Sequence, residues 1–353
     1  MKRLAIVLYN LGGPDCLEAV EPFLYNLFMD RAIIDQPLVV RWPLAKLISK
    51  RRAPFARDIY NHIGGKSPLL ELTQAQADAL QVSLEKKYRD TEVKCFICMR
   101  YWHPMSPEVA QKVKDFGPDQ VVMLPLYPQF STTTTGSSFD DWDATAARIG
   151  LTAPTKRICC FPVDPGFISA QAQLLKSSID QARAEADGQP LRILFSAHGL
   201  PKKIIEKKSD PYPDQVQKGA AVIAAEMIKI GTKLEDWLVS YQSRVGPMEW
   251  IGPSTEDEIK RAGQDGVALV ILPIAFVSEH SETLVELDIE YKLLADQAGV
   301  TTYVRVPALG TTPSFIDGLA SLVQRTIAQN KNLCPAGEKS RICPNMASAC
   351  SHQ

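Results

Sequence analysis

Three carboxylates recur at every fourth position late in the chain, at Glu282, Glu286 and Glu290. If this segment is an α-helix, the three side chains lie on one face and repel one another by about 0.2–0.5 kcal/mol per neighbouring pair. Such a ladder could hold a divalent cation or pass protons, and it could equally be a solvated acidic face. His280, just before Glu282, adds an imidazole that can serve as a metal ligand or as a base. The segment alone leaves these alternatives open.

The residues before the carboxylates predict where in a fold they lie. Residues 267–277 are apolar and rich in valine and isoleucine, which is typical of a strand buried on both faces of a parallel sheet. The run is too short to span a bilayer. Leu284, Leu287 and Tyr291 then recur at helical spacing. The carboxylates therefore follow the carboxyl end of a predicted strand, where open α/β sheets place their ligands.

Two other predicted strands also end in residues that can do chemistry. His198 follows the strand predicted over residues 191–197 and precedes a glycine. A single histidine is most often structural, but here its ring can be held out into a cleft, where a base that titrates near neutral pH can accept protons. Arg100 and Tyr101 follow the strand predicted over residues 93–99. Their basic and aromatic side chains indicate a binding site at that strand end.

The elements that carry these residues alternate between strand and helix in both halves of the chain. Strands are predicted at residues 4–9, 93–99, 120–126 and 156–161, and again at 191–197, 237–241, 267–277 and 302–306. This order predicts an α/β fold of two doubly wound domains with parallel sheets. The predicted parts are two domains, a last helix and a cysteine-bearing tail, over residues 1–163, 164–306, 307–330 and 331–353. The glycine turn after the first strand has neither a G-x-G-x-x-G motif nor a P-loop lysine, which argues against a nucleotide site.

Composition and charge narrow the function classes. The chain has 353 residues, of which 45% are hydrophobic, so it can bury substantial cores. Its net charge of −1 argues against nucleic-acid binding. The first residues lead into a strand without a secretory cleavage site, so we expect a cytoplasmic protein. Residues 37–49 are largely apolar and are followed by Lys50, Arg51 and Arg52. This segment could be a packed helix with a charged end, the lip of a pocket, or a surface that rests on a membrane.

Eight cysteines in a chain of this length do not predict a secreted disulfide scaffold. Cys334, Cys343 and Cys350 lie in a tail without apolar periodicity, which cannot fold by itself. Ligation of a metal centre by these thiolates would order the tail, and the alternative is a disordered tail with free thiols. Cys95 and Cys98 match C-x-x-C, but residues three apart in a strand point to opposite faces, so we reject this pair as a chelate.

Taken together in chain order, these features make the sequence resemble the ferrochelatase family from Leu4 to about Gln329. The motifs that carry the resemblance are Leu11-Gly-Gly-Pro14, Ile63-Gly-Gly-x-Ser-Pro68, Arg100-Tyr-x-His-Pro104, Tyr127-Pro-Gln129, Thr135-Gly-Ser-Ser138, Ser196-Ala-His198, Asp210-Pro-Tyr-Pro213, Ser243-x-Val-Gly-Pro247, Trp250-x-Gly-Pro253 and Glu282-Thr-Leu-x-Glu-Leu-Asp-x-Glu-Tyr291. Each motif is weak alone, and all of them in this order make a specific signal.

The resemblance implies two Rossmann-like domains that face each other across a porphyrin-binding cleft, with the last helix packing back on the first domain. It also implies the reaction, which is insertion of Fe²⁺ into protoporphyrin IX to form protoheme in the last step of heme biosynthesis. Insertion removes the pyrrole N–H protons, and a flat macrocycle hides its nitrogen lone pairs. The enzyme must therefore bend the ring, and a rigid, aromatic-walled cleft can use binding energy to do so.

The resemblance also assigns roles to residues. His198 matches the family's active-site histidine and Glu282 its partner carboxylate, and we expect them to come from the two halves of the molecule and meet over opposite sides of the ring. We expect His198 to accept protons, and Glu282 to lead a path for protons or iron. The candidate iron ligands along this path are His198, Glu282, Glu286 and Glu290. The positions that line the macrocycle pocket are Tyr9, Leu11, Arg100, Tyr101 and Trp250. The positions at the mouth, where arginine can bind propionates through paired hydrogen bonds, are Arg51, Arg52 and Ser67.

Some ferrochelatases carry a [2Fe–2S] cluster, and the resemblance extends this expectation to the three cysteines of the tail. Animal members take a fourth ligand from the position occupied here by Thr132, so Cys159 or Cys160 is the expected substitute. These two are adjacent in a predicted strand and should face opposite ways, so only one of them can serve. Zinc is an alternative occupant, because four cysteines also suit that ion.

Two other functions compete with the leading one. The same chemistry on coproporphyrin III would need more basic groups at the mouth, because that porphyrin has four propionates. A tetrapyrrole or metal carrier without catalysis would be a degenerate chelatase, against which the intact His198 and Glu282 argue. The resemblance further allows a peripheral contact with the inner membrane and a homodimer, and the sequence leaves the oligomeric state open.

Overall fold

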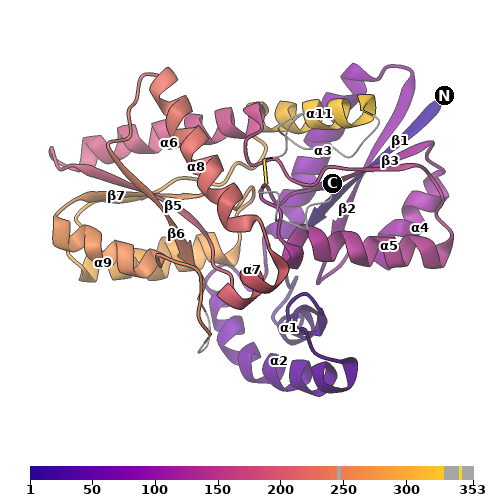
Figure 1. Cartoon of the computed structure of the whole chain (residues 1–353), viewed down its shortest axis with the longest axis horizontal. Helices are drawn as coiled ribbons and strands as arrows, with labels where there is room; N and C mark the ends of the chain where they lie inside the picture. The colour runs from indigo at the N-terminus through magenta and orange to yellow at the C-terminus, as the bar shows by residue number, and fades with distance from the viewer. Residues whose placement is uncertain (245–247, 330–341, 344–353) are drawn as a thin grey trace. The chain divides into compact units, whose positions relative to one another are not determined.

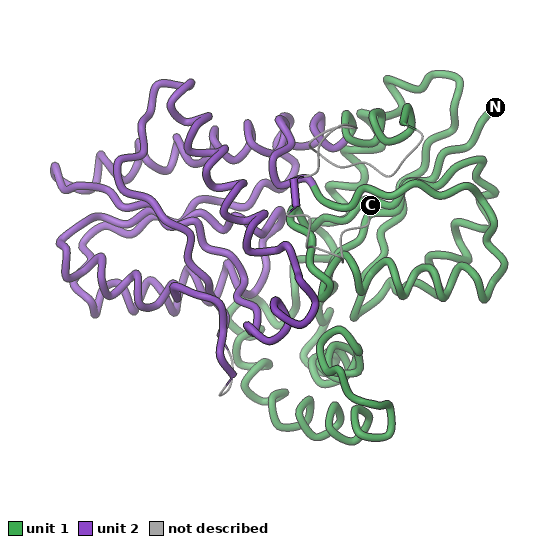
Figure 2. Tube along the Cα trace, viewed as in Figure 1, with its two compact units in different colours: residues 1–160, 320–333, 351–353 green, residues 161–319, 334–350 purple. Residues whose placement is uncertain are grey.

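The computed structural model describes residues 1–244, 248–329 and 342–343, which form two compact units (Figure 1 and Figure 2). Unit 1 contains residues 1–160 and 320–329, and unit 2 contains residues 161–319 and 342–343. Each unit is built on a four-stranded parallel sheet with helices packed on it. The predicted fold class, α/β with two doubly wound, Rossmann-like domains, is confirmed.

The sheet of unit 1 has the strand order β2-β1-β3-β4. Its strands are β1 (Lys2–Asn10), β2 (Thr91–Met99), β3 (Gln120–Pro125) and β4 (Thr155–Arg157). All neighbours pair in parallel, and the central strands β1 and β3 are almost fully buried. One face of the sheet packs on α4 (Ser106–Phe116) and α5 (Ser137–Ile149), which a short wide helix, η1 (Thr132–Gly136), precedes. Burial on both faces explains why these strands read as continuous apolar runs.

The remaining helices of unit 1 are α1 (Val20–Met29), α2 (Leu38–Asn61), α3 (Leu69–Lys87) and the end of α11 (Pro313–Ala328). Lys87 Nζ donates to Gln324 Oε1 at 3.2 Å, and Lys156 Nζ donates to the carbonyl of Ile327 at 2.8 Å. The end of α11 therefore packs within unit 1, which begins again at residue 320.

Apolar side chains of α2 face solvent. Val39 is 82% exposed and Phe55 is 61% exposed. The other exposed apolar side chains of this helix are Leu38, Val40, Trp42, Leu44 and Leu47. These exposures argue against the alternative of a fully packed helix. Among the residues that the structure describes, no helix has both the length and the apolar character needed to cross a membrane.

The sheet of unit 2 has the strand order β6-β5-β7-β8, again with parallel neighbours. Its strands are β5 (Leu191–His198), β6 (Asp236–Gln242), β7 (Ala268–Pro273) and β8 (Tyr303–Arg305). Its helices are α6 (Pro165–Glu185), α7 (Lys202–Lys208), α8 (Tyr212–Lys229), α9 (Thr255–Asp265), the wide helix η2 (Glu282–Glu290) and α10 (Tyr291–Gln297). The carboxyl ends of β5, β6 and β7 lie side by side, because β5 pairs with both neighbours along its length.

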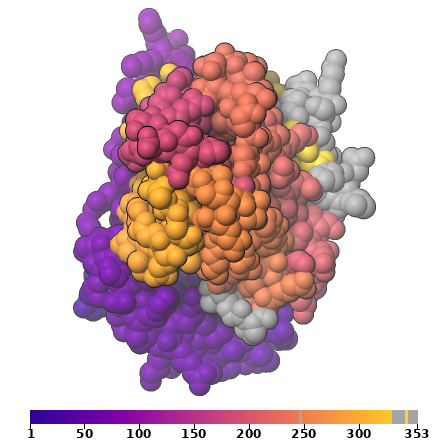
Figure 3. Space-filling view, turned by 90° about the vertical axis from the view of Figure 1, so that its left-hand side faces the viewer, coloured from indigo at the N-terminus to yellow at the C-terminus, as the bar shows by residue number. Residues whose placement is uncertain are grey.

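Strands and helices alternate along unit 2, and its sheet is parallel, so the carboxyl ends of the strands lie at one edge of the sheet. Figure 3 shows a surface of unit 2, whose residues are coloured from magenta to orange. His198 closes β5, and Glu282 opens η2 after β7. Both residues therefore lie at the carboxyl ends of the strands, which is where a ligand is expected in this fold.

Candidate active site

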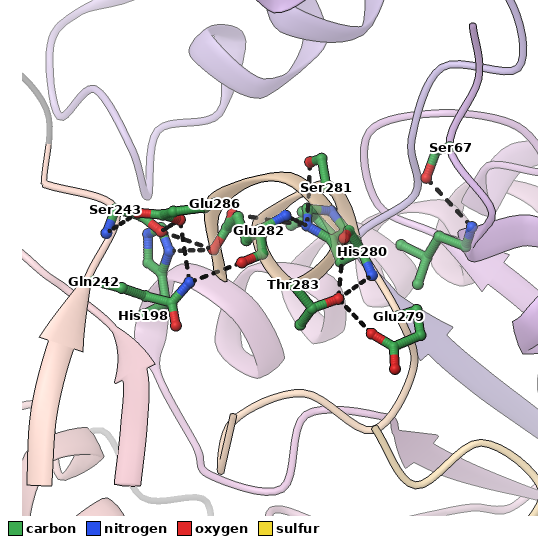
Figure 4. Close-up of polar contacts among 12 residues, drawn as sticks. Ser67, His198, Gln242, Ser243, Glu279, His280, Ser281, Glu282, Thr283 and Glu286 are labelled. Atoms are coloured by element: carbon green, nitrogen blue, oxygen red, sulfur yellow. Dashed lines mark hydrogen bonds and ion pairs between the residues drawn. The ribbon is translucent and has the colours of Figure 1, made fainter. Parts of the chain in front are cut away.

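His198 and Glu282 form a direct hydrogen bond. The Nδ1 atom of His198 lies 2.7 Å from Oε2 of Glu282 (Figure 4). The imidazole is 39% exposed and the carboxylate 24% exposed. Burial tends to lower the pKa of His198, but the adjacent Glu282 outweighs it and raises that pKa above its ordinary value. Burial likewise opposes ionisation of Glu282, yet the contact with His198 brings its pKa down to about 2. Below the raised pKa of His198 the pair is an imidazolium beside a carboxylate, and above it the neutral imidazole stays hydrogen-bonded to the carboxylate.

This geometry corrects the prediction that the two groups come from the two halves of the molecule and face each other across a ring. Both residues belong to unit 2, and their side chains touch. The reason is the strand pairing, because β5 delivers His198 and its neighbour β7 leads to η2. Their hydrogen bond leaves no room for a macrocycle between them.

Glu286 sits next to this pair in a network of donors. Its Oε1 accepts from the Ser243 N–H at 2.8 Å and from the Tyr291 hydroxyl at 2.9 Å. Its Oε2 accepts from the Ser243 hydroxyl at 2.5 Å and from Gln242 Nε2 at 3.1 Å. Burial and the nearby charge of Glu282 raise the pKa of Glu286. Two neighbouring carboxyl groups thus have pKa values pushed apart, a pattern that separates an ionised group from a proton donor.

Ser243 links the two carboxylates, since its hydroxyl also lies 3.1 Å from Glu282 Oε2. It has a φ of +63°, which is unusual for a residue other than glycine. Gln242 adds a second link, because its Nε2 also donates to the carbonyl of Glu282 at 3.1 Å. The prediction did not single out these two polar residues, although both follow the predicted strand over residues 237–241 and could have been found from that position.

The ladder of carboxylates is shorter than the sequence predicts. Residues 282–290 form a wide helix, in which the Tyr291 N–H bonds to the carbonyl of Glu286. Glu282 and Glu286 are connected through Ser243, whereas Glu290 is exposed at the end of the helix. Wide helices of this length are rare and occur mostly at functional sites, and α-helical spacing does not apply to them.

His280 borders the pair from the other side. It is 6% exposed, and its Nδ1 accepts from the Glu282 N–H at 3.3 Å. Burial lowers the pKa of His280, so it stays neutral where His198 is charged. Trp250 lies beside the strand end, where its ring would be 3.4 Å from a Cβ atom placed on Gly199. The same Cβ atom would come within 2.9 Å of the Gln242 carbonyl, so only glycine fits next to His198.

Several predicted pocket residues lie in unit 1. Tyr9 is 1% exposed, and its ring packs edge-on against Phe139 and Trp142. Tyr101 is fully buried and donates its hydroxyl proton to Asp30 Oδ2 at 2.7 Å. Both side chains serve the core of unit 1 and offer almost no surface to a ligand, which departs from the prediction that they line the macrocycle pocket. The reason is tertiary packing, which the strand end alone does not reveal.

Arg100 belongs to the same buried network of unit 1. Its Nη2 lies 3.1 Å from Asp30 Oδ2, and its Nε donates to the Ser137 hydroxyl at 2.7 Å. Asp141 adds a second carboxylate at 3.7 Å. Burial tends to lower the pKa of Arg100, but these carboxylates raise it. The guanidinium is therefore already paired. Leu11, the other predicted pocket residue here, is half-buried.

The predicted mouth residues also lie in unit 1. Arg51 is exposed on α2, and Arg52 lies over the Phe28 ring at 6.0 Å. Ser67 is buried, and its N–H donates to the carbonyl of Pro14 at 2.8 Å. A Cβ atom on Gly13 would approach the Ser67 hydroxyl to 2.4 Å, so the two predicted glycine turns pack directly on each other.

The cysteines correct another prediction. β4 ends at Arg157, so Cys159 and Cys160 lie beyond the strand and do not alternate. Their sulfur atoms are 3.4 Å apart, and both side chains are buried. Cys343 is buried too, and its sulfur lies 3.1 Å from Gln215 Nε2. Cys334 and Cys350 lie outside the described residues. Within the described ranges, no three His, Cys, Asp or Glu side chains are arranged to hold a metal ion.

Comparison with known proteins gives a consistent result. The sequence model of the family described as Ferrochelatase matches residues 3–327. The chain is 51% identical to "Ferrochelatase" of Caulobacter vibrioides over 328 residues, which cover 93% of this chain and 91% of the relative. It is 46% identical to "Ferrochelatase" of Pelagibacter ubique over 353 residues, which cover 98% and 99%. Among solved structures, the sirohydrochlorin chelatase SirB from Bacillus subtilis subspecies spizizenii in complex with cobalt has a TM-score of 0.53 at 11% identity, covering 94% of this chain and 97% of that one. That likeness shows the fold alone.

Proposed function

The chain belongs to the ferrochelatase family, lyases that insert Fe²⁺ into a porphyrin in heme synthesis, and we propose that its porphyrin is protoporphyrin IX and its proton acceptor His198. The observation that carries the proposal is the hydrogen bond of 2.7 Å between His198 and Glu282 at the carboxyl ends of the strands of unit 2. An acceptor for pyrrole protons must be basic near neutral pH and partly exposed, and His198 meets both conditions.

The hydrogen bond to Glu282 determines which nitrogen of His198 accepts the proton. With Nδ1–H donated to the carboxylate, the lone pair of Nε2 is left to receive a proton from a pyrrole N–H. The carboxylate then stabilises the imidazolium that forms. Glu286, linked to Glu282 through the Ser243 hydroxyl, is the next group that can hold a proton or assist the iron, and Glu290 would be the solvent end of this path.

The choice of porphyrin is inferred from the predicted mouth. Arg51 and Arg52 are the basic residues proposed to bind propionates, and protoporphyrin IX has two propionates whereas coproporphyrin III has four. The test is anaerobic mixing of the protein with Fe²⁺ and each porphyrin while the absorption bands are followed. Faster metallation of protoporphyrin IX supports the proposal, and faster metallation of coproporphyrin III contradicts it. A carrier would bind a porphyrin without converting the free base.

A matched variant tests the acceptor. His198→Gln keeps a polar side chain of similar length but removes the base, so metallation should fall by about two orders of magnitude or more. Binding of the free-base porphyrin, followed by fluorescence quenching, should stay close to wild type. Full turnover in His198→Gln would exclude this residue as the acceptor.

We also propose that a [2Fe–2S] cluster is held by Cys334, Cys343, Cys350 and one of Cys159 and Cys160. Lys156, shortly before this cysteine pair, donates to the carbonyl of Gln329, so the tail leaves from the vicinity of β4. From Gln329 to Cys334 the chain can span at most about 18 Å. The cluster would order the tail by thiolate ligation. Wild-type protein should show the charge-transfer absorption bands of an iron–sulfur cluster, and Cys343→Ser should lack them. Metal analysis that finds zinc instead of iron would contradict the proposed cluster.

The exposed apolar side chains of α2 support a peripheral membrane contact. The proposed location is the cytoplasm, with peripheral binding to the inner membrane surface. Lys50, Arg51 and Arg52 on the same helix could add attraction to anionic lipids. Co-sedimentation with vesicles that contain anionic lipid should be measurable and should fall in a Leu47→Asp variant. A homodimer stays a prediction, which light scattering would test.

A further inference from the structure

The first turn of α8 contacts the candidate proton acceptor. This turn begins at Tyr212, in the Asp210-Pro-Tyr-Pro213 motif, whose role the proposed function leaves open. The hydroxyl of Tyr212 donates to the carbonyl oxygen of His198 at 3.0 Å. Tyr212 is 7% exposed, and its N–H donates to Asp210 Oδ1 at 3.1 Å, which holds the start of the helix. Burial raises the pKa of the Tyr212 hydroxyl well above its ordinary value, so the hydroxyl remains a donor at all working pH values.

This contact fixes the peptide group that follows His198. The carbonyl of that peptide accepts from Tyr212, and its N–H, which belongs to Gly199, donates to the carbonyl of Gln242 at 2.8 Å. On its other side, His198 is held by the pairing of β5 with β6, in which it lies opposite Gln242. The backbone on both sides of His198 is therefore restrained, and from this position its ring reaches Glu282. Without the hydroxyl, the peptide is held at one end only.

The same side of α8 also binds the tail. Gln215 Nε2 lies 3.1 Å from the sulfur of Cys343, and Lys218 Nζ donates to the carbonyl of Ile342 at 3.4 Å. Tyr212, Gln215 and Lys218 are spaced by three residues, so neighbouring contacts lie on adjacent parts of the helix surface. Ile342 and Cys343 are both buried by this docking. A single stretch of helix therefore contacts the strand end that bears His198 and the tail.

We propose that Tyr212 is a positioning residue for His198, and that docking of Ile342 and Cys343 on α8 supports this position. The inference rests on the proposed role of His198 as the proton acceptor, but it does not depend on a cluster. A positioning residue changes the reacting group without contacting the porphyrin, so its loss should lower kcat and leave KM for the porphyrin unchanged.

The test combines kinetics with a direct view of the imidazole. The chain has five histidines, so selective ¹⁵N-histidine labelling gives few signals, and His198→Gln identifies those of His198. In full-length Tyr212→Phe, the ring nitrogen signals of His198 should shift, and kcat should fall about fivefold, the effect expected from loss of one buried hydrogen bond. Thr302→Val is the matched control, because it removes another buried hydroxyl of unit 2 that donates to a main-chain carbonyl, that of Glu185. Its His198 signals and kcat should match wild type.

A merely structural role gives a different result. If Tyr212→Phe only lowers the folded fraction, the His198 signals of the folded protein stay at their wild-type positions, and the proposal is overturned. If Tyr212→Phe does not fold, Gln215→Met is the second variant, because it removes the contact of α8 with Cys343. A shift of the His198 ring signals, smaller than that expected for Tyr212→Phe, supports the proposal. Unshifted His198 signals overturn it. Failure of the proposed function would look different. If His198 is not the proton acceptor, His198→Gln retains turnover, whatever Tyr212→Phe does to the ring signals.

Discussion

Replacement of Glu282 by glutamine should move the pH dependence of metallation to lower pH. The change keeps the size of the side chain and a hydrogen-bond acceptor, but it removes the charge beside His198. Glu282 raises the pKa of His198, so its loss should let that pKa fall. The imidazole must be neutral to accept a pyrrole proton, so the acid limb of kcat/KM follows the pKa of His198. A lower pKa therefore shifts this limb toward acid.

The size of the shift follows from the contact. A hydrogen bond to a charged group contributes about 1.5–3 kcal/mol, which corresponds to about one to two pKa units. His198 is 39% exposed and solvent screens the interaction, so the lower end, about one unit, is expected. The plateau rate should also fall, because glutamine does not stabilise the imidazolium that forms.

The assay is initial metallation rate under anaerobic conditions from about pH 5.5 to 9, with a porphyrin concentration far below KM so that kcat/KM is read directly. Asp296→Asn is the control, because it neutralises an exposed carboxylate on α10, which directly continues η2. Its profile should match wild type. An acid limb that stays in place in Glu282→Gln, or moves to higher pH, would refute the reasoning about the pair.

Folding stability should respond to the same pair with two opposite signs. The pKa of Glu282 is lowered on folding to about 2, so its contribution is present above its unfolded pKa and is lost as the pH falls toward 2. The pKa of His198 is raised on folding, so its contribution is present below its unfolded pKa and is lost as the pH rises through the folded pKa. Urea unfolding at several pH values should show both effects in wild type and neither in a variant that lacks both side chains.

Further predictions concern unit 1. Asp30→Ala should lower the free energy of unfolding by about 3–5 kcal/mol, measured by urea unfolding, because it leaves the buried guanidinium of Arg100 without its closest carboxylate. Gly13→Ala should be destabilising, because its Cβ atom would collide with the Ser67 hydroxyl; Gly13→Ala combined with Ser67→Gly should recover much of the loss if the collision is the cause. Val39→Asp should weaken vesicle binding while unfolding in urea stays within about 0.5 kcal/mol of wild type, since this side chain is 82% exposed. An unchanged affinity for vesicles would argue against contact through α2.

The sequence was sufficient to predict the fold class and the positions of the chemical groups along it. Apolar runs buried on both faces identify the parallel strands, and parallel strands bring their carboxyl ends to one edge of the sheet. For this reason His198 and Glu282 could each be predicted to follow the carboxyl end of a strand, whereas their pairing came from the family resemblance and was expected across a ring. Their direct contact could not be predicted, because it depends on which neighbouring strand leads to η2.

Two of the wrong predictions read side-chain direction from the expected local structure, and others carried a residue's surroundings over from the family resemblance. Cys159 and Cys160 were expected to face opposite ways, but β4 ends before them. The glutamate spacing was interpreted with an α-helical period, but η2 is wide and leaves Glu290 exposed. Tyr9 in β1 and Tyr101 just beyond β2 are buried against Phe139 and Asp30, which are distant in the sequence.

The two carboxyl groups of η2 show how one element can hold neighbouring groups whose pKa values shift in opposite directions. The imidazole of His198 holds the pKa of Glu282 at about 2, whereas burial and the charge of Glu282 raise the pKa of Glu286 against the lowering effect of its hydrogen-bond donors. In η2 the Tyr291 N–H donates to the carbonyl of Glu286, five residues earlier, and the Tyr291 hydroxyl donates to the Glu286 carboxylate. Because the Ser243 hydroxyl contacts both carboxylates, a proton taken up by His198 has a continuous set of hydrogen-bonded groups leading away from it. On the proposed role of His198, Glu286 is therefore the next carboxyl group along this set of contacts.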